Sequence, residues 1–182
     1  MTDARIVKTK QKIKNSISLL LLKKDLQNIT VAELCEYAHI SRTTFYKNYD
    51  NTRLVVEGII EELISETLDF GNELFACIGE KKTNQISMCE LIRHNKKYLP
   101  IIRSDEIAQI FVERLSEKID DKTVIAVCNA KRMKADDVRT LFEFQLSGCV
   151  NQIRKNYELT DKEWKEKKKA IDSFLKSGYK ID

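Results

Sequence analysis

The stretch TVAELCEYAHISRTTFYKNY, residues 30–49, decides the fold of this chain. Thr30 stands three residues before Glu33, which is the spacing of a capping box. In such a box each of the two side chains satisfies a free backbone N–H at the start of a helix. The spacing therefore predicts a short helix over residues 31–38.

A second short helix is predicted over residues 41–48, because Ser41 is a good N-cap. Two or three residues, around His39 and Ile40, separate the two helices. Two short helices joined by so tight a turn indicate a helix-turn-helix, whose second helix lies in the DNA major groove with its N-terminal residues at base edges. Phe45 is interpreted as the residue that anchors this second helix to the helices before it.

The side chains of the second helix suit contact with DNA. Hydroxyl and amide groups can donate to phosphates or bases, and the forked guanidinium of Arg42 can bind guanine. Lys47 can bind a phosphate. The candidate DNA-contacting residues of this helix and its end are Ser41, Arg42, Thr43, Thr44, Tyr46, Lys47, Asn48 and Tyr49.

Further helices are predicted on both sides of this pair, so the fold class is all-α. Asp50 is interpreted as the N-cap of a long helix that runs to about Phe75. We expect a three-helix DNA-binding domain over residues 1–50 and a helical body over residues 51–182. Before the pair lies a helix over residues 4–22, whose apolar stripe is Val7, Ile13, Ile17, Leu20 and Leu21. After the long helix, further helices are predicted near 84–97, 105–119, 136–157 and 161–178. Residues 121–134 form either a buried helix turn or a packed connection.

The composition excludes several other classes of protein. Five glycines and one proline in 182 residues are too few turn-formers for an all-β sandwich or barrel. Hydrophobic residues make up 42% of the chain, too much for a disordered tail. The longest run without a charged residue is ten, from Phe144 to Ile153, whereas roughly 18 are needed to cross a bilayer. We therefore expect no membrane partner.

The positive charge of the chain is concentrated in its first third. Residues 1–53 hold ten Lys or Arg and five Asp or Glu, whereas residues 54–182 hold 22 and 23. A basic head on a near-neutral body indicates a head that binds a polyanion. By charge alone, a solvated basic face is an equal alternative.

The five cysteines, at positions 35, 77, 89, 128 and 149, form no C-x-x-C pair, and two histidines give no zinc spacing. Reduced thiols in a cytoplasmic protein are the interpretation that follows from the redox compartment. Oxidant sensing stays open, because reactivity needs a thiolate-favouring site that a sequence does not show. No acid–base pair or nucleophile group is visible, so we expect neither an enzyme nor a cofactor.

Residues 1–56 resemble the N-terminal domain of the TetR (tetracycline repressor-like) family of bacterial regulators. The family pattern A-G-V-S-x-x-T-F-Y-x-H-F-x-x-K-x-x-L stands here as AHISRTTFYKNYDNTRLV, residues 38–55, and ITVAELC at 29–35 looks like the family's second helix. The resemblance implies a homodimeric, sequence-specific DNA-binding regulator. It implies contacts to the DNA backbone from Thr30, Tyr46 and Tyr49, and contacts to bases or neighbouring phosphates from Arg42, Thr43 and Thr44.

The chain departs from the family pattern at three positions. His39 stands where the family has its turn glycine, and a left-handed turn is several-fold rarer outside glycine. Asn48 replaces the family's histidine near the end of the recognition helix and keeps the capacity for hydrogen bonding. Thr52 replaces a lysine at the start of the next helix, so one phosphate contact depends on Arg53 beside it.

The predicted helices 136–157 and 161–178 lie where the family has its four-helix dimer interface. A single helix-turn-helix makes few base contacts, and two-fold dimers on palindromic operators are the usual remedy. Gly148 costs its helix about 1 kcal/mol against Ala, which close helix approach would explain. An intrachain core is the alternative for each candidate interface residue: Leu141, Gly148, Cys149, Trp164, Ile171 and Phe174.

A small-molecule inducer of unknown identity is expected among the middle helices. The leading hypothesis is a repressor released when a ligand re-angles two DNA-binding heads through the long helix. The alternative is a regulator, repressor or activator, controlled by a protein co-regulator. A closed apolar pocket favours the first and an exposed apolar patch the second. The candidate pocket residues, each of which suits the core better than a pocket, are Phe75, Met88, Tyr98, Phe111 and Phe144.

Overall fold

The computed structural model describes residues 4–69, 88–95 and 97–178, and within these ranges the chain forms helices and no strand. The predicted all-α class is therefore confirmed for the part of the chain that is described. The helices are α1 (Ala4–Leu21), the short 3-10 helix η1 (Leu26–Asn28), α2 (Val31–Ala38), α3 (Arg42–Tyr46), α4 (Thr52–Asp69), α5 (Met88–His94), α6 (Leu99–Arg103), α7 (Asp105–Glu117), α8 (Asp121–Lys131), α9 (Ala135–Lys155) and α10 (Asp161–Gly178).

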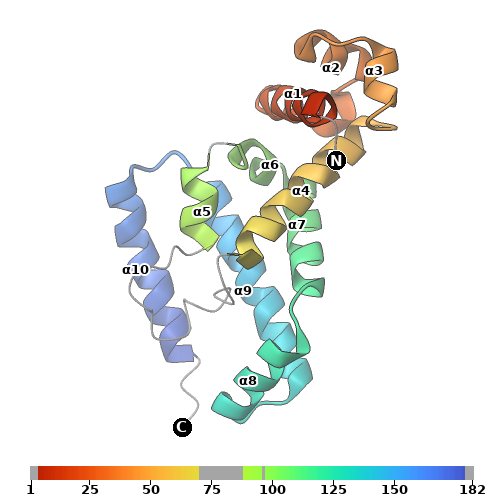
Figure 1. The fold of residues 1–182 in the computed structure, drawn as a ribbon. Helices are drawn as coiled ribbons and strands as arrows, with labels where there is room; N and C mark the ends of the chain where they lie inside the picture. The colour runs from red at the N-terminus through yellow and green to blue at the C-terminus, as the bar shows by residue number, and fades with distance from the viewer. Residues whose placement is uncertain (1–3, 70–87, 96, 179–182) are drawn as a thin grey trace.

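Helix α4 runs between two parts of the molecule (Figure 1). At one end lies the head, helices α1 to α3, in which α1 packs on α2 and α4, and α3 packs on α2. At the other end lies the body, helices α5 to α10, in which α7 packs on α4, α6 and α9. One apolar core cluster extends from Ile13 on α1 to Trp164 on α10. The division into domains at residue 50 stays a prediction.

The predicted capping box at Thr30 and a second one at Thr160, before α10, form to different extents. At Thr160 the box is complete: its hydroxyl accepts from the backbone N–H of Glu163 at 3.4 Å, and the Glu163 carboxylate accepts from the backbone N–H of Thr160 at 2.9 Å. At Thr30 the hydroxyl accepts from the backbone N–H of Glu33 at 3.2 Å, but the Glu33 carboxylate binds Lys24 at 2.6 Å. Glu33 therefore ties α2 to the turn after α1.

The structure corrects one predicted helix start, adds one helix and decides between the alternatives for one segment. Asn51 caps α4 in place of Asp50, because its side-chain oxygen accepts the backbone N–H of Leu54 at 2.9 Å. Between the predicted helices near 84–97 and 105–119 lies the additional short helix α6, with Pro100 in its first turn, where the missing N–H breaks no intrahelical bond. The open segment 121–134 contains the helix α8.

Helix α1 differs from its predicted apolar stripe at two positions. Val7 was expected to be buried but is 55% exposed, whereas Ile13 and Ile17 are fully buried. Lys14, which is not part of the apolar stripe, is nevertheless buried, because α4 passes over that face and supplies partners for its ammonium group. The predicted helix ends near Phe75 and residue 84 lie outside the described residues.

Candidate nucleic-acid interface

A left-handed turn joins α2 to α3. His39 ends α2 with φ 52° and ψ 50°, a conformation that costs a non-glycine residue roughly 1–2 kcal/mol. The backbone N–H groups of His39 and Ile40 donate to the carbonyls of Glu36 at 3.1 Å and Cys35 at 3.0 Å, which closes the end of α2. The left-handed turn is therefore present although histidine stands in place of glycine, and the backbone of His39 is strained.

One buried ring holds the short helix α3 in place. The Ser41 hydroxyl caps the helix by accepting the backbone N–H of Thr44 at 3.1 Å. Phe45 is fully buried, and its ring lies 5.5 Å from that of Tyr46 and 6.2 Å from that of Tyr49. The predicted anchoring role of Phe45 is confirmed, and the other side of α3 is left facing outward.

The outward side of α3 carries polar side chains. Arg42, Thr43, Tyr46 and Lys47 are exposed, and Tyr46 has 56% of its surface open. A guanidinium, an ammonium and two hydroxyls on one exposed side match the chemistry of phosphates and base edges. We call these four residues the recognition face.

Other candidate DNA contacts have partners within the chain. The hydroxyls of Ser41 and Thr44 lie 2.9 Å apart, and the amide of Asn48 donates to the Thr44 carbonyl at 2.8 Å. The guanidinium of Arg53 donates to Glu57 at 3.2 Å. These bonds hold the end of α3 and the first turns of α4. Asn48 and Arg53 would have to share or exchange them on binding DNA.

Thr30 and Tyr49 lie beside the recognition face. Thr30 is exposed, and its hydroxyl accepts the cap bond while its proton can be donated to a phosphate oxygen. Tyr49 is half-buried, with the Lys10 ammonium 5.7 Å from the centre of its ring. Burial, followed by the charge of Glu62, raises the pKa of Tyr49 to about 12, so the phenol stays a neutral donor. Lys10 is a candidate contact that the sequence did not single out.

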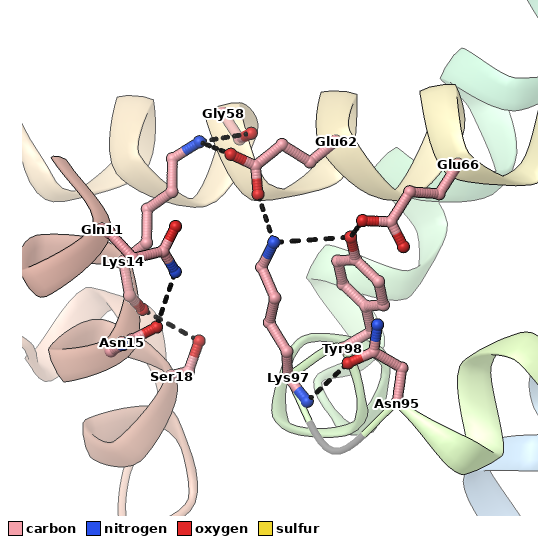
Figure 2. Close-up of polar contacts among 10 residues, drawn as sticks. All are labelled: Gln11, Lys14, Asn15, Ser18, Gly58, Glu62, Glu66, Asn95, Lys97 and Tyr98. Atoms are coloured by element: carbon pink, nitrogen blue, oxygen red, sulfur yellow. Dashed lines mark hydrogen bonds and ion pairs between the residues drawn. The ribbon is translucent and has the colours of Figure 1, made fainter. Parts of the chain in front are cut away.

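A chain of charged side chains joins the head to the body (Figure 2). The Lys14 ammonium on α1 donates to the Gly58 carbonyl at 2.9 Å and to the Glu62 carboxylate at 2.6 Å, both on α4. The other carboxylate oxygen of Glu62 accepts from Lys97, between α5 and α6. Glu62 therefore bridges a lysine of the head and a lysine that follows α5. We call these three residues the Glu62 bridge.

Tyr98 adds a second link between α4 and the body. It is fully buried, and its hydroxyl donates to Glu66, one turn after Glu62. Burial, then the hydrogen bond to Glu66, raises the pKa of Tyr98 above its usual value. Burial also acts to raise the pKa of Glu62, but hydrogen bonds from Lys14 and Lys97 outweigh burial, so the pKa of Glu62 lies below its ordinary value. At neutral pH Tyr98 is therefore a donor and Glu62 an acceptor.

Arg114 ties α4 to α7. Its guanidinium lies 3.0 Å from the carboxylates of both Glu57 and Glu61 on α4. Neither this contact nor the Glu62 bridge was found from the sequence. The partners are far apart in the chain, and each charged residue alone looks like part of a solvated helix face.

The predicted pocket residues do not lie together around one cavity. Tyr98 and Phe111 are fully buried in the core, Met88 is partly buried, and Phe75 lies outside the described residues. Phe144 is 66% exposed, which does not suit a closed pocket within the chain. The reason is its position on α9, whose buried face lies on the other side of the helix.

A hollow of about 310 Å³ lies between α7 and α9. The buried side chains of Val112 and Val150 line it, together with the charged groups of Glu113, Glu143 and Arg154. This volume is at the lower end of the range for small-molecule sites. The predicted pocket residues are not among those that line it.

The predicted interface residues fall into a buried and an exposed set. Cys149 and Trp164 are only 7% and 3% exposed and belong to the chain's own core, so they offer almost no surface to a second copy. Phe174 is 67% exposed. Gly148 is exposed, and no atom of the described chain lies within 4 Å of the place where a Cβ would stand. Within the part of the chain that the structure describes, Gly148 therefore has open space in front of it.

A small apolar cluster between α9 and α10 stays outside the main core. Leu175 is its buried member, and Leu141 and Ile171 pack against it. Phe144 and Phe174 are exposed on the same two helices. Helices α9 and α10 therefore present apolar surface to solvent. We call Phe144, Phe174, Leu141 and Ile171 the apolar patch.

Residues 4–69, 88–95 and 97–178 contain neither a membrane-spanning helix nor a metal-binding cluster. No helix there is long and apolar enough to span a bilayer, and no three potential metal-binding side chains come together. Cys35, Cys89, Cys128 and Cys149 are free thiols, and Cys77 lies outside these ranges.

Among known proteins, a similarity is found only at the level of solved structures. No protein-family model matches the sequence, and no curated protein matches it. The chain is similar to the crystal structure of the TetR family repressor AlkX from Dietzia sp. strain DQ12-45-1b, implicated in biodegradation of n-alkanes, with 17% sequence identity and a TM-score of 0.44. The match covers 92% of this chain and 95% of that chain. At this TM-score the likeness says nothing of what this chain binds.

Proposed function

We propose that this protein is a TetR-like transcription regulator that binds a palindromic operator as a homodimer. The observation that carries the proposal is the α2–turn–α3 unit, in which Phe45 is buried and the recognition face is exposed. An exposed second helix of this kind fits the major groove. The positive surplus of residues 1–53 supports attraction to phosphates.

The side chains of the interface divide into readers of bases and binders of phosphate. Arg42 and Thr43 stand in the first turn of α3, the part of a recognition helix that reaches base edges. Tyr46, Lys47 and Thr30 bind the sugar–phosphate backbone. The remaining candidates position α3, or contact DNA only after giving up a bond within the chain, because their polar groups already have partners or are half-buried. They are Ser41, Thr44, Asn48, Tyr49 and Arg53.

The apolar patch supports the homodimer. Two exposed phenylalanines on neighbouring helices lose contact with water if a second copy covers them, which is favourable by about 25 cal/mol per Å² of apolar surface. Gly148 on the same helix as Phe144 leaves room for close approach. Two-fold pairing of α9 and α10 would place two copies of α3 on successive half-sites.

Regulation by a small ligand fits the contacts of α4. A ligand in the hollow between α7 and α9 acts on α7, and Arg114 of α7 is paired with Glu57 and Glu61 of α4. The Glu62 bridge carries a movement of α4 to α1 and the head. Binding of the ligand and of DNA are then reciprocally coupled, and the ligand releases a repressor.

The apolar patch also favours a second candidate function, control by a protein co-regulator. Sedimentation of the free protein separates the two. A dimer whose Phe174→Asp variant is monomeric assigns the patch to self-association. A monomer leaves the patch open to a different protein and favours the co-regulator.

DNA binding is tested by fluorescence anisotropy with labelled DNA from upstream of the protein's own gene. Random DNA of equal length is the control, and both are measured over a salt series. Tight binding to one segment, with a salt slope that reports several phosphate contacts, supports the proposal. No binding of either DNA at any salt concentration contradicts the interpretation of residues 1–53.

A further inference from the structure

Four exposed residues form one line along the outer face of α9: Asp137, Phe144, Gly148 and Lys155. They are separated by seven, four and seven residues. At 3.6 residues per turn, this spacing places all four within about 40° of one another around the helix axis. The opposite face of α9 is buried in the core of the chain. We call these four residues the α9 row.

The α9 row is symmetric in position and complementary in chemistry. A carboxylate and an ammonium group stand at its two ends, and a large ring and a residue without a side chain stand between them. When a second copy of the helix lies antiparallel across the first, residues at equal distances from the midpoint of the row face each other. A two-fold axis at that midpoint therefore brings Phe144 to Gly148 and Asp137 to Lys155, each pair twice.

The described part of the chain leaves the two central residues of the row uncovered. Phe144 is 66% exposed, which is unfavourable for a ring of its size. No described atom lies within 4 Å of the place where a Cβ of Gly148 would stand. A ring from a second copy can therefore pack directly against the backbone at Gly148.

The charged ends of the row also lack partners within the described residues. Both arginines of α9 form ion pairs with carboxylates of neighbouring helices, one on α7 and one on α8. Asp137 and Lys155 are exposed and form no such pair with any described residue. Their opposite charges are thus available to a second copy, and they are complementary only when the two helices are antiparallel.

We propose that α9 of one copy packs antiparallel on α9 of a second copy, with Phe144 of each against Gly148 of the other and Asp137 paired with Lys155. The inference rests on the proposed homodimer and adds the register of the two helices and the residues that select a second copy. Asp137 and Lys155 lie about 27 Å apart along the helix. A crossing angle of about 20°, as in four-helix bundles, keeps both ends of the row within reach of a lysine side chain.

The neighbouring row of α9 provides a matched control. Asp136 precedes Asp137 in the first turn of the helix, but it is rotated by about 100°, to the side where Glu143 and Ser147 face the hollow against α7. Both aspartates are exposed, and both stand at the helix N-terminus, where a negative charge is favourable. A lysine at either position therefore disturbs α9 itself to a similar extent, whereas only Asp137 belongs to the α9 row.

The experiment measures the dissociation constant of the dimer by sedimentation velocity of the full-length protein at low salt. Asp137→Lys and Lys155→Asp should each raise this constant about tenfold, because each change places like charges face to face at both ends of the symmetric contact. Asp136→Lys should leave it unchanged. The rise should shrink in high salt, which screens exposed charges.

A mixture of the two charge variants gives the sharpest result. A heterodimer of Asp137→Lys with Lys155→Asp restores an opposite-charge contact at both ends, whereas either homodimer has two like-charge contacts. Native mass spectrometry of an equal mixture, with one variant tagged, should therefore show mainly heterodimer. Each chain carries a single change, so an effect within one chain does not produce this preference.

Gly148→Leu tests the centre of the row. The described chain leaves space for the new side chain, and leucine favours a helix more than glycine does, so the helix content seen by circular dichroism should not fall. The dissociation constant of the dimer should rise about tenfold or more, because leucine takes the place of the ring from the second copy.

Random mixing of the two charge variants, an effect of Asp136→Lys as large as that of Asp137→Lys, or a Gly148→Leu dimer as tight as the wild type overturns the α9 pairing. In these cases a homodimer still forms through other surfaces, and the proposed function stands. A wild-type protein that is monomeric at every concentration contradicts both the pairing and the homodimer.

Discussion

The recognition face and the apolar patch expose opposite kinds of side chain. On α3 the charged ends of Arg42 and Lys47 face outward over a buried Phe45. On α9 and α10, Phe144 and Phe174 face outward instead. Exposed charged groups are stabilised by water, so their exposure costs little free energy. Covering large apolar groups is favourable, because it removes apolar surface from water. The comparison therefore teaches that one end of the molecule suits a charged partner and the other an apolar one.

The largest expected effect is a loss of stability when the buried ring of the head, Phe45, is removed. Phe45→Ala should lower the free energy of unfolding by about 3–5 kcal/mol, because it deletes a fully buried ring. Urea unfolding followed by circular dichroism measures this. The matched variant is Tyr46→Ala on the same helix, which should change stability by about 1 kcal/mol or less and leave the dimer intact while weakening DNA binding. Equal urea midpoints for the two variants would contradict the anchoring role of Phe45.

The second effect falls on the apolar patch. Phe174→Asp should weaken the dimer by at least about 2 kcal/mol, a factor of roughly 30, because a carboxylate would be buried without a partner. Analytical ultracentrifugation over a concentration series measures the change. Ile125→Asp, at an exposed isoleucine on α8, is the control and should leave the dimer unchanged. A Phe174→Asp protein that stays dimeric would move the interface elsewhere.

The third effect falls on the recognition face. Lys47→Ala should weaken binding of operator and random DNA by a similar factor and reduce the salt slope by about 1, because it removes one phosphate contact. Lys122→Ala on α8 removes an exposed lysine far along the chain and serves as the control. Anisotropy over a salt series gives both slopes. A monomeric Lys47→Ala protein would show that α3 has been misread as a binding element.

A smaller effect on stability is expected at the junction of the head and the body, where Glu62 lies. The pKa of Glu62 is lowered in the folded protein, so its ionised form contributes stability above the unfolded pKa of about 4.3, and the contribution is lost as pH falls through the lower folded value. Glu62→Gln removes this contribution, by about 1 kcal/mol or less since the side chain is 37% exposed. Unfolding measured from pH 7 to 3 should show the two proteins converging at acid pH. A constant difference over that range would mean that charge is not the cause.

The smallest effect is expected at the turn of the head. His39→Gly should raise the free energy of unfolding by about 0.5 kcal/mol, because glycine adopts φ 52° without the strain of a Cβ but loses more chain entropy. Thermal melts at one protein concentration measure the change. A lower melting temperature would show that the imidazole itself stabilises the turn.

The helix-turn-helix could be predicted because its signals are local. Thr30 and Ser41 each cap a helix through a backbone N–H three residues further on, and both contacts form. Phe45 could be placed inside by its position on a short helix. The departures have local causes too: Asn51 caps α4 in place of its neighbour Asp50.

The junction could not be predicted because its contacts depend on how helices cross. Lys14 follows the buried Ile13 and looks like the start of a polar face, yet α4 lies over it. Phe111 and Phe144 are chemically alike, but one is fully buried and the other exposed. Periodicity places a residue on a face of its own helix, but it does not say which face another helix covers.

The sequence by itself determined the all-helical class and the place of the helix-turn-helix with its set of candidate contacts, since caps, spacing and side-chain chemistry act within a few residues. Only the tertiary structure decided that Glu62 bridges Lys14 and Lys97 and that the apolar patch faces outward. The physical reason is that burial and pairing depend on the angles and distances between helices, and those are set by the packing of the whole core.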